Sequence, residues 1–359
     1  GTTKLRVKTT DGTNTVYSQE YIIKIDKEAP TNAAPTVNAT TNSLTVTNKQ
    51  IDNLSGIASV QYAIYKGNSW SAWQTSNQFT GLTHNTTYKV KTKTTDKVGN
   101  ASESAENTTA KTSNLVAGTL TLTHNTASGS AYTSNTWTKD SVYVALVKAS
   151  TGTTTYESIT GSAQSVGSGT TADTTVTTNG TTTLRVKTTD GTNTVYSSNY
   201  VIKVDKAKPT AGTLTMKLDS TTGSTYTSGN WTNQSVWLHK NDGSDTLSGH
   251  KSTTYTVSGA NLTNQTADNT ISVEGKYTAT VTTYDNVYNS STNSYNVKID
   301  KTAPTTTTPT ATSTTNEITV TFKQTDSLSG INASTKQYAI YKNGAWSAWQ
   351  TSNEFTGLT

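Results

Sequence analysis

The stretch TYKVKTKTTDKVGN, from Thr87 to Asn100, alternates between two kinds of side chain. Aromatic, aliphatic and hydroxyl residues occupy every second position from Tyr88, and three lysines fill the positions between them. Side chains on a β-strand point alternately to its two faces, so this pattern predicts a strand with one buried and one solvated face. The stretch LRVKTTDG, which begins at Leu184, alternates in the same way. Helical periodicity is not found, and the sequence therefore indicates an all-β fold.

The chain repeats itself over long stretches. GTTKLRVKTTDGTNTVYS, beginning at Gly1, returns almost unchanged at Gly180. WSAWQTSNQFTGLT, beginning at Trp70, returns at Trp346 with one substitution. Such internal self-similarity is typical of arrays in which one structural unit is copied many times. Because the first and last copies are cut short, we expect the chain to be part of a longer protein.

The boundaries follow from the repeats KIDKEAPT, KVDKAKPT and KIDKTAPT, which place prolines at Pro30, Pro209 and Pro304. We expect two types of segment. Type A comprises residues 1–30, 116–209 and 210–304, of which the first is incomplete, and type B comprises residues 31–115 and 305–359, of which the second is incomplete.

The sequence resembles two families of β-sandwich. FTGLTHNTTYKVKTKTTDKVGN is similar to the second half of a fibronectin type III-like domain, because Gly81 and Leu82 precede Tyr88 by the spacing of a tyrosine corner. The ends of the type A segments resemble bacterial immunoglobulin-like repeats of cell-surface and adhesin-type proteins. The resemblance implies that residues 1–30 are the C-terminal part of an Ig-like domain and that residues 31–115 are a fibronectin type III-like domain. Residues 116–209 and 210–304 would then be two Ig-like domains, and residues 305–359 the N-terminal part of a second fibronectin type III-like domain.

The expected architecture is a tandem array of immunoglobulin-like and fibronectin type III-like β-sandwiches arranged as an elongated rod. The segments follow one another with short linkers, each containing a proline. Proline fixes one backbone angle and holds the preceding residue in an extended conformation, which favours semi-rigid joints.

Composition excludes several functions. The chain has no Cys, so disulfides, thiolate nucleophiles and cysteine zinc sites are excluded. The net charge of +5 is spread along the chain, which argues against nucleic-acid binding, and no apolar run is long enough to span a membrane. No catalytic motif is present, and we expect no enzyme. Of the four histidines, His239 and His250 share a segment, and we expect them to be solvated loop residues.

Recurring aspartates are the candidate site. DNLSG, DTLSG and DSLSG contain Asp52, Asp245 and Asp326, and each stretch is expected to lie in a loop that faces the preceding segment. Two triads of carboxylates are then expected to converge at domain junctions, where they would provide oxygen ligands for Ca²⁺. Their members are Asp26, Asp52 and Asp96 in the first and Asp205, Asp245 and Asp285 in the second.

A second explanation of these aspartates stays open. Asp and Asn stabilise turns by accepting hydrogen bonds from their own backbone, with no metal involved. This explanation is the simpler one, since a complete calcium site needs six or more oxygens. No other cofactor is expected.

Tryptophans offer another candidate site. Trp70 and its counterpart Trp346 are candidates for stacking on a ligand, because exposed aromatic rings bind sugars. Trp70 and Trp73 are three residues apart, however, and on one strand would face opposite sides. We therefore expect one ring in the core and the other partly exposed, and core packing is the favoured role.

The expected function is mechanical. We expect a stalk or fibre segment of a large bacterial cell-surface or secreted adhesin-like protein, located outside the cell and providing reach and rigidity. Copies of one unit suit this role, since a spacer needs only length and solubility. The alternatives are a carbohydrate- or host-protein-binding module, or accessory repeats of a secreted hydrolase or phage fibre. Expected partners are other copies in a fibre, or a host surface or glycan bound through regions outside this segment.

Overall fold

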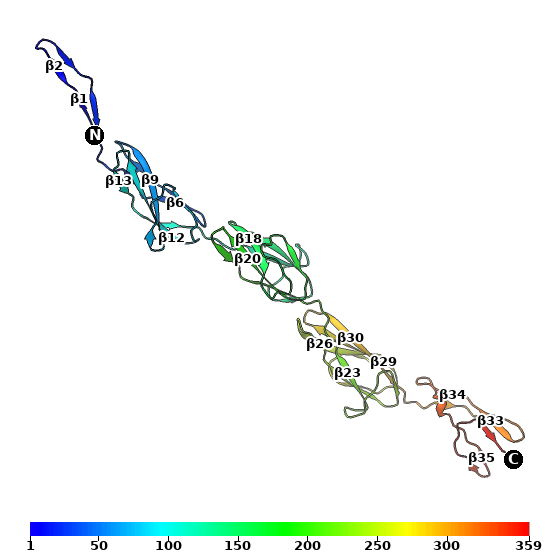
Figure 1. Cartoon of the computed structure of the whole chain (residues 1–359). Coiled ribbons are helices and arrows are strands. Elements are labelled where there is room, and N and C mark those ends of the chain that lie inside the picture. The colour runs from blue at the N-terminus through cyan, green and yellow to red at the C-terminus, as the bar shows by residue number, and fades with distance from the viewer. Residues whose placement is uncertain (359) are drawn as a thin grey trace. The chain divides into compact units, whose positions relative to one another are not determined.

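The computed structural model describes residues 1–358, and they form an all-β protein (Figure 1). The only helix among these residues is one 3₁₀ turn, Ala333–Thr335. No helix of the described chain combines the length and the apolar character that crossing a bilayer requires. Contacts group the chain into two compact units, of which the first comprises Gly1–Thr136 with Asp140–Val204 and the second Trp137–Lys139 with the chain from Asp205 on.

In the first unit, residues 31–115 form two main sheets. The three-stranded sheet has the order β11-β7-β6. The larger sheet has the order β10-β9-β12-β13, and β14 also pairs with β12. A short pair, β5 with β8, completes the segment. The strands are β5 (Thr31–Asn32), β6 (Thr36–Ala39), β7 (Leu44–Thr47), β8 (Gln50–Ile51), β9 (Ile57–Lys66), β10 (Ser69–Trp70), β11 (Gln78–Phe79), β12 (Thr87–Asp96), β13 (Ala101–Glu103) and β14 (Asn107–Lys111).

The core of this segment confirms the alternation of the opening stretch. On β12, Tyr88 and Val90 are buried against Leu44 and Val46 of β7. The lysines between them are exposed or half-buried on the other face. Burying such side chains stabilises a segment by roughly 1.5–3 kcal/mol each.

Residues 116–204 repeat this arrangement with their own core. One sheet has the order β15-β17-β19; in the other, β20 lies between β18 and β22 and also pairs with β21. Tyr156, Leu184 and Ile202 are fully buried in the hydrophobic cluster of this segment. The strands are β15 (Thr119–His124), β17 (Val142–Val147), β18 (Thr153–Ser158), β19 (Thr174–Val176), β20 (Gly180–Thr189), β21 (Thr194–Tyr196) and β22 (Tyr200–Val204).

The second unit contains a third hydrophobic cluster, centred on Leu238, Tyr255 and Ile299. Its sheets have the orders β23-β25-β28 and β24-β30-β29-β26-β27, in which β24 runs parallel to β30. The strands of this part, with β16 (Trp137–Thr138), are β23 (Thr213–Leu218), β24 (Trp231–Thr232), β25 (Val236–Asn241), β26 (His250–Ser258), β27 (Leu262–Gln265), β28 (Asn269–Ile271), β29 (Gly275–Asp285) and β30 (Ser290–Ile299).

Residues 305–358 repeat the first strands of the type B segment. β32, β33 and β37 form one sheet, and β31 with β34 and β35 with β36 form two pairs. The strands are β31 (Thr305–Thr306), β32 (Thr310–Ser313), β33 (Glu317–Thr321), β34 (Gln324–Thr325), β35 (Tyr341–Lys342), β36 (Ala345–Trp346) and β37 (Glu354–Thr356).

The hairpins of residues 1–30 show what the two-sheet arrangement contributes. β1 pairs with β4 and β2 pairs with β3. Leu5 is 52% exposed, whereas Leu184, at the same position of the second copy, is fully buried. Within residues 1–358, the sheet of β15, β17 and β19 faces the second copy of these strands, and no sheet faces the first copy. The strands are β1 (Thr2–Leu5), β2 (Lys8–Thr10), β3 (Thr15–Tyr17) and β4 (Tyr21–Lys24).

Buried tyrosine hydroxyls hold loops to the strands. The hydroxyl of Tyr88 accepts a hydrogen bond from the backbone N–H of Thr83 at 3.0 Å, which confirms that this tyrosine bonds back to nearby backbone. In the second unit, the Tyr226 hydroxyl accepts from the Lys298 N–H at 2.9 Å and donates to the Asn230 carbonyl.

The division into five domains stays a prediction, because the contacts define two units.

We predict that Tyr88→Phe lowers the free energy of unfolding of residues 31–115 by about 1 kcal/mol, because the Thr83 N–H loses its partner. Denaturant unfolding followed by Trp fluorescence measures the change. Tyr65→Phe is the matched control, since its hydroxyl makes no hydrogen bond within residues 1–358 and its ring is half-buried. An equal loss in both variants would contradict the assignment.

Candidate functional site

The first aspartate triad lies where β4, β8 and β12 end. Asp26 follows β4, Asp52 follows β8, and Asp96 is the last residue of β12. One carboxylate oxygen of each lies within 4.8 Å of those of the other two. Asp96 is only 2% exposed, and the other two are half-buried. The structure thus brings together the three residues that the sequence placed in one cluster.

Backbone N–H groups surround the carboxylates of this triad. Asp52 Oδ1 accepts from the N–H groups of Leu54 and Gly56 at 3.1 and 2.6 Å. Asp26 Oδ2 accepts from the N–H of Ser55 at 3.0 Å, which ties the linker aspartate to the loop of the next segment. These bonds position the carboxylates and form the turns that the second explanation requires.

The second triad repeats the first in the second unit. Asp205 and Asp285 are fully buried, Asp245 is half-buried, and their carboxylate oxygens also lie within 4.8 Å of one another. Asp245 Oδ2 accepts from the N–H groups of Leu247 and Gly249 at 3.0 and 2.8 Å. The recurrence shows that a fixed sequence pattern produces this arrangement.

An asparagine bridges two members of each triad, and the sequence reasoning missed this role. Asn289 Nδ2 donates to Asp285 Oδ2 at 2.7 Å and to the backbone carbonyl of Asp205 at 3.0 Å. Asn100 makes the same two bonds in the first triad, at 2.7 and 3.4 Å. The signal was present, because both asparagines stand four residues after the last aspartate of their triad.

A serine of the DxLSG stretch also lies at each triad and was not identified from the sequence. The N–H of Ser248 donates to Asp205 Oδ2 at 3.0 Å, as Ser55 does to Asp26. Within residues 1–358, the buried Oγ atoms of both serines make no hydrogen bond of normal geometry. Each triad therefore has a buried hydroxyl beside it that lacks a well-placed partner.

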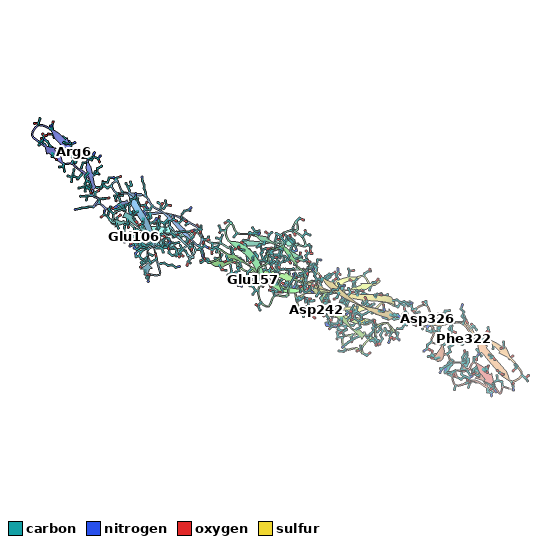
Figure 2. All side chains as sticks on the ribbon, turned by 45° about the horizontal axis from the view of Figure 1, so that its top comes forward. Arg6, Glu106, Glu157, Asp242, Phe322 and Asp326 are labelled. Atoms are coloured by element: carbon teal, nitrogen blue, oxygen red, sulfur yellow. The ribbon has the colours of Figure 1, made fainter. Side chains whose placement is uncertain are left out.

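Asp300 and Asp326 begin a third arrangement of this kind. Asp300 Oδ2 accepts from the N–H of Ser329 at 2.9 Å, and Asp326 Oδ1 accepts from Leu328 and Gly330 at 3.1 and 2.6 Å. Within residues 1–358, no third carboxylate joins Asp300 and Asp326, the latter labelled in Figure 2, as Asp96 joins the first triad.

The surroundings favour the charged form of several triad carboxyls. The hydroxyl of Ser55 is the main cause that lowers the pKa of Asp26, although its position lies outside normal hydrogen-bond geometry. Burial acts to raise the pKa of Asp96, but hydrogen bonds from Asn100 outweigh it and the pKa is lowered. The Ser329 side chain lowers the pKa of Asp300. These carboxyls therefore remain ionised at neutral pH.

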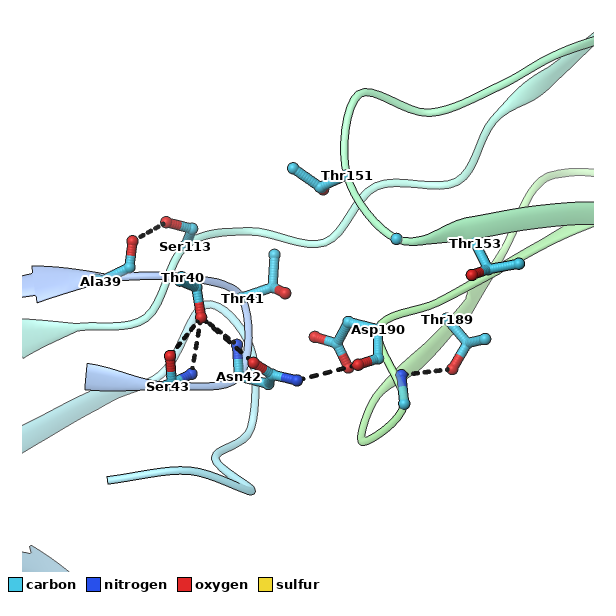
Figure 3. Close-up of a pocket in the computed structure, with 12 residues that line it drawn as sticks. Ala39, Thr40, Thr41, Asn42, Ser43, Ser113, Thr151, Thr153, Thr189 and Asp190 are labelled. Atoms are coloured by element: carbon cyan, nitrogen blue, oxygen red, sulfur yellow. Dashed lines mark hydrogen bonds between the residues drawn. The ribbon is translucent and has the colours of Figure 1, made fainter. Parts of the chain in front are cut away.

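Residues 31–115 and 116–204 of the first unit meet through a different turn. A cleft of about 810 Å³ lies between them. Asn42 and Asp190 are among the residues that line it (Figure 3). Asn42 Nδ2 donates to the Asp190 carbonyl at 3.0 Å. Asn193 Nδ2 donates to the Leu82 carbonyl at 3.0 Å, and Asn193 Oδ1 accepts from the His84 N–H at 3.3 Å. The DGTN turn at Asp190 thus holds the preceding segment directly.

Within residues 1–358, the same turn at Asp11 makes no such contact with another segment. Asp11 Oδ1 accepts from the N–H groups of Thr13 and Asn14 at 2.9 and 2.7 Å, as Asp190 does within its own turn. Around Asp190, burial acts to raise the pKa, but hydrogen bonds from Thr41 and Asn193 lower it to about 2. A contact with the neighbouring segment therefore contributes to the stability of the Asp190 carboxylate.

The tryptophans correct one expectation. Trp70 and Trp73 are both half-buried and neither belongs to a hydrophobic core cluster, so the expected core role is wrong. Lys91 Nζ lies 4.7 Å from the Trp70 ring centre and 5.2 Å from that of Trp73. The β10 strand ends at Trp70, so the rule for alternating faces does not reach Trp73. Ligand stacking at Trp70 stays a prediction, but a lysine already covers one face of the ring.

Trp346 is 70% exposed. Its strand β36 pairs only with β35 within residues 1–358, whereas in residues 31–115 the strand β12 lies beside β9 and contains the covering lysine. The exposure of Trp346 therefore gives no support to ligand stacking.

The histidines also differ from expectation. His239 lies within β25, where its Nδ1 is 2.8 Å from Asp268 Oδ1 and its ring stacks on Trp237. His250 is the first residue of β26, and its Nε2 is 2.9 Å from Thr253 Oγ1. They are thus strand residues with partners rather than loop residues. No potential metal cluster within residues 1–358 contains a histidine.

Comparisons with known proteins give little further information. No protein-family model matches the chain, and no curated protein matches it significantly. Similar solved structures include a tetra-tandem repeat in the extending region of a large adhesion protein, with 16% identity over 92% of this chain and 90% of that chain and a TM-score of 0.29. They also include Bacteroides ovatus SGBP-B of a mixed-linkage glucan utilization locus, in complex with a mixed-linkage heptasaccharide, with 12% identity, 80% and 74% coverage and a TM-score of 0.18. Similarity at this level carries no argument about what this chain does.

We predict that acid weakens the first unit through Asp190. Its pKa is lowered from 3.8 to about 2 on folding, so its contribution is fully present above pH 4 and is lost as the pH falls through 2. The shift corresponds to about 1–2 kcal/mol after allowance for partial exposure.

Unfolding titrations from pH 5 to pH 2 measure this effect. Asp190→Asn is expected to flatten the acid dependence. Asp11→Asn, in the same turn, is the comparison. Backbone hydrogen bonds from Asn14 and Thr13 also lower the pKa of Asp11, but the side chain of Thr41 acts on Asp190 alone, so Asp11→Asn should flatten the acid dependence less. Identical curves for wild type and Asp190→Asn would contradict the prediction.

Proposed function

We propose that this chain is a structural repeat segment, a stalk or fibre, of a large bacterial cell-surface or secreted adhesin-like protein. Its sandwiches are of immunoglobulin-like and fibronectin type III-like type, they follow one another as an elongated rod, and they work outside the cell by providing reach. They have no catalytic role. The sequence supports this proposal because near-identical copies recur and no catalytic motif is present.

One observation carries the proposal: the ends of the segments are tied to their neighbours by repeated polar networks. Asp26 bonds to the loop at Ser55, and Asn100 bonds to the carbonyl of Asp26. At the next junction, Asn193 bonds to the carbonyl of Leu82 and the N–H of His84. Networks of this kind restrict bending at a junction, since each bond has a preferred direction. A spacer that must hold a distant tip in place requires such junctions.

The first experiment measures the shape of the whole chain. Small-angle X-ray scattering should give a maximum dimension and a cross-section typical of a string of separate sandwiches. A compact particle would overturn the proposed rod.

The second experiment measures the junction between residues 31–115 and 116–204. Because the chain has no Cys, cysteines introduced at the exposed residues Ser76 and Ser168 can be spin-labelled selectively. We expect a narrow distance distribution in the otherwise unchanged chain and a clearly broader one in Asn193→Ala, which loses both bonds to the preceding segment.

Asn14→Ala is the matched control for this measurement. It removes the same side chain from the same DGTN turn, but the turn at Asp11 makes no contact with residues 31–115. Its distance distribution should equal that of the unchanged chain. A broad distribution in the unchanged chain would contradict a rigid junction, whatever the variants show.

A further inference from the structure

Three carboxylates meet in each triad, with one oxygen of each within 4.8 Å of the others. Asp205 and Asp285 are fully buried and Asp245 lies beside them. No ion pair within residues 1–358 involves any of the six triad carboxylates. Like charges at this separation repel one another, and burial increases the repulsion because it lowers the dielectric constant. Buried charges are normally paired or bound to a metal.

A buried hydroxyl is a second and independent observation. Ser248 is 9% exposed, and its Oγ is fully buried and has no hydrogen-bond partner within residues 1–358. The N–H of the same residue donates to Asp205 Oδ2, so the short side chain lies beside the triad. A buried hydroxyl without a partner is costly, and such groups require an explanation. A ligand at the triad would provide the missing partner.

The turn explanation does not account for the free carboxylate oxygens. Asp245 accepts both of its turn hydrogen bonds on Oδ2, and Oδ1 accepts none within residues 1–358. Asp52 likewise accepts both bonds on Oδ1. An asparagine would form the same turns with one oxygen and no charge. The second oxygen and the charge therefore need another function.

We propose that Asp205, Asp245 and Asp285, together with the hydroxyl of Ser248, bind a calcium ion. Calcium binds oxygen ligands at 2.3–2.6 Å, so two ligands on opposite sides of the ion lie up to about 5 Å apart. The separations within 4.8 Å in the triad fit that limit. The ligand set is oxygen alone, which suits calcium or magnesium rather than zinc or copper. Water would complete the coordination.

The first triad is a second and weaker site. A Cβ atom added to Gly56 would lie 3.6 Å from Lys97 Nζ, whereas one added to Gly249 would lie 3.1 Å from Asn286 Nδ2. A lysine ammonium thus stands beside the first triad where the second has a neutral amide. The positive charge competes with a cation, so the second triad binds calcium more tightly.

The experiment titrates Ca²⁺ into the chelator-treated 359-residue chain by isothermal titration calorimetry. We expect two binding events, the tighter with a dissociation constant of about 0.1–1 mM, as in other extracellular modules. Asp245→Asn keeps the turn hydrogen bonds and removes the charge, and it should weaken the tighter event at least tenfold. Asp52→Asn should affect only the weaker event. Asp268→Asn, an exposed aspartate paired with His239, is the control and should change neither.

Ser248→Ala tests the hydroxyl separately. It keeps the backbone N–H bond to Asp205, and it should weaken the tighter event severalfold without changing the weaker one. Thermal unfolding gives a second measurement, in which Ca²⁺ should raise the melting temperature of the wild type and of Asp268→Asn.

Two results would overturn the proposal. In the first, the wild type shows neither binding heat nor a change in melting temperature up to 10 mM Ca²⁺, as the turn explanation predicts. In the second, Asp245→Asn binds calcium as the wild type does. Neither result bears on the proposed spacer function, which the scattering and distance measurements test independently.

Discussion

Residues 31–115, 116–204 and 210–304 each depend on the burial of one face of a sheet against another. The buried face of β12 contains few large apolar side chains, because Thr92 and Thr94 share it with Tyr88 and Val90. A core that is partly threonine buries fewer apolar atoms than a core of valine or leucine, so each segment has little hydrophobic stabilisation to spare. Hydrogen bonds from tyrosine hydroxyls, carboxylates and amides therefore take a larger share in fixing the loops. This constraint explains why so many polar side chains of the structure are bonded to backbone.

The sequence was sufficient for the fold class and for the composition of the triads. Alternation identifies a strand because its period of two is a property of the extended backbone. Convergence of Asp26, Asp52 and Asp96 followed from the order of strands that the family resemblance supplied. The contribution of Ser55 was not predictable in this way, because a serine in a turn has many partners in reach.

Other features required the structure itself. The positions of Trp70 and Trp73 were predicted wrongly, because the strand ends between them and the chain turns. The contact of Asn193 with Leu82 joins two segments, and no local pattern reports such a contact.

The near-identity of residues 1–18 and 180–197 has a consequence for assembly. Both hairpins present the same apolar side chains, although Leu184 is buried and Leu5 is exposed within residues 1–358. Only Lys4, in place of Thr183, distinguishes them. Because the two stretches are nearly identical, one can pair in the position of the other, which is a known form of misfolding in repeat proteins. Correct pairing then depends on chain connectivity, because strands that are close in the sequence meet before strands that are far apart.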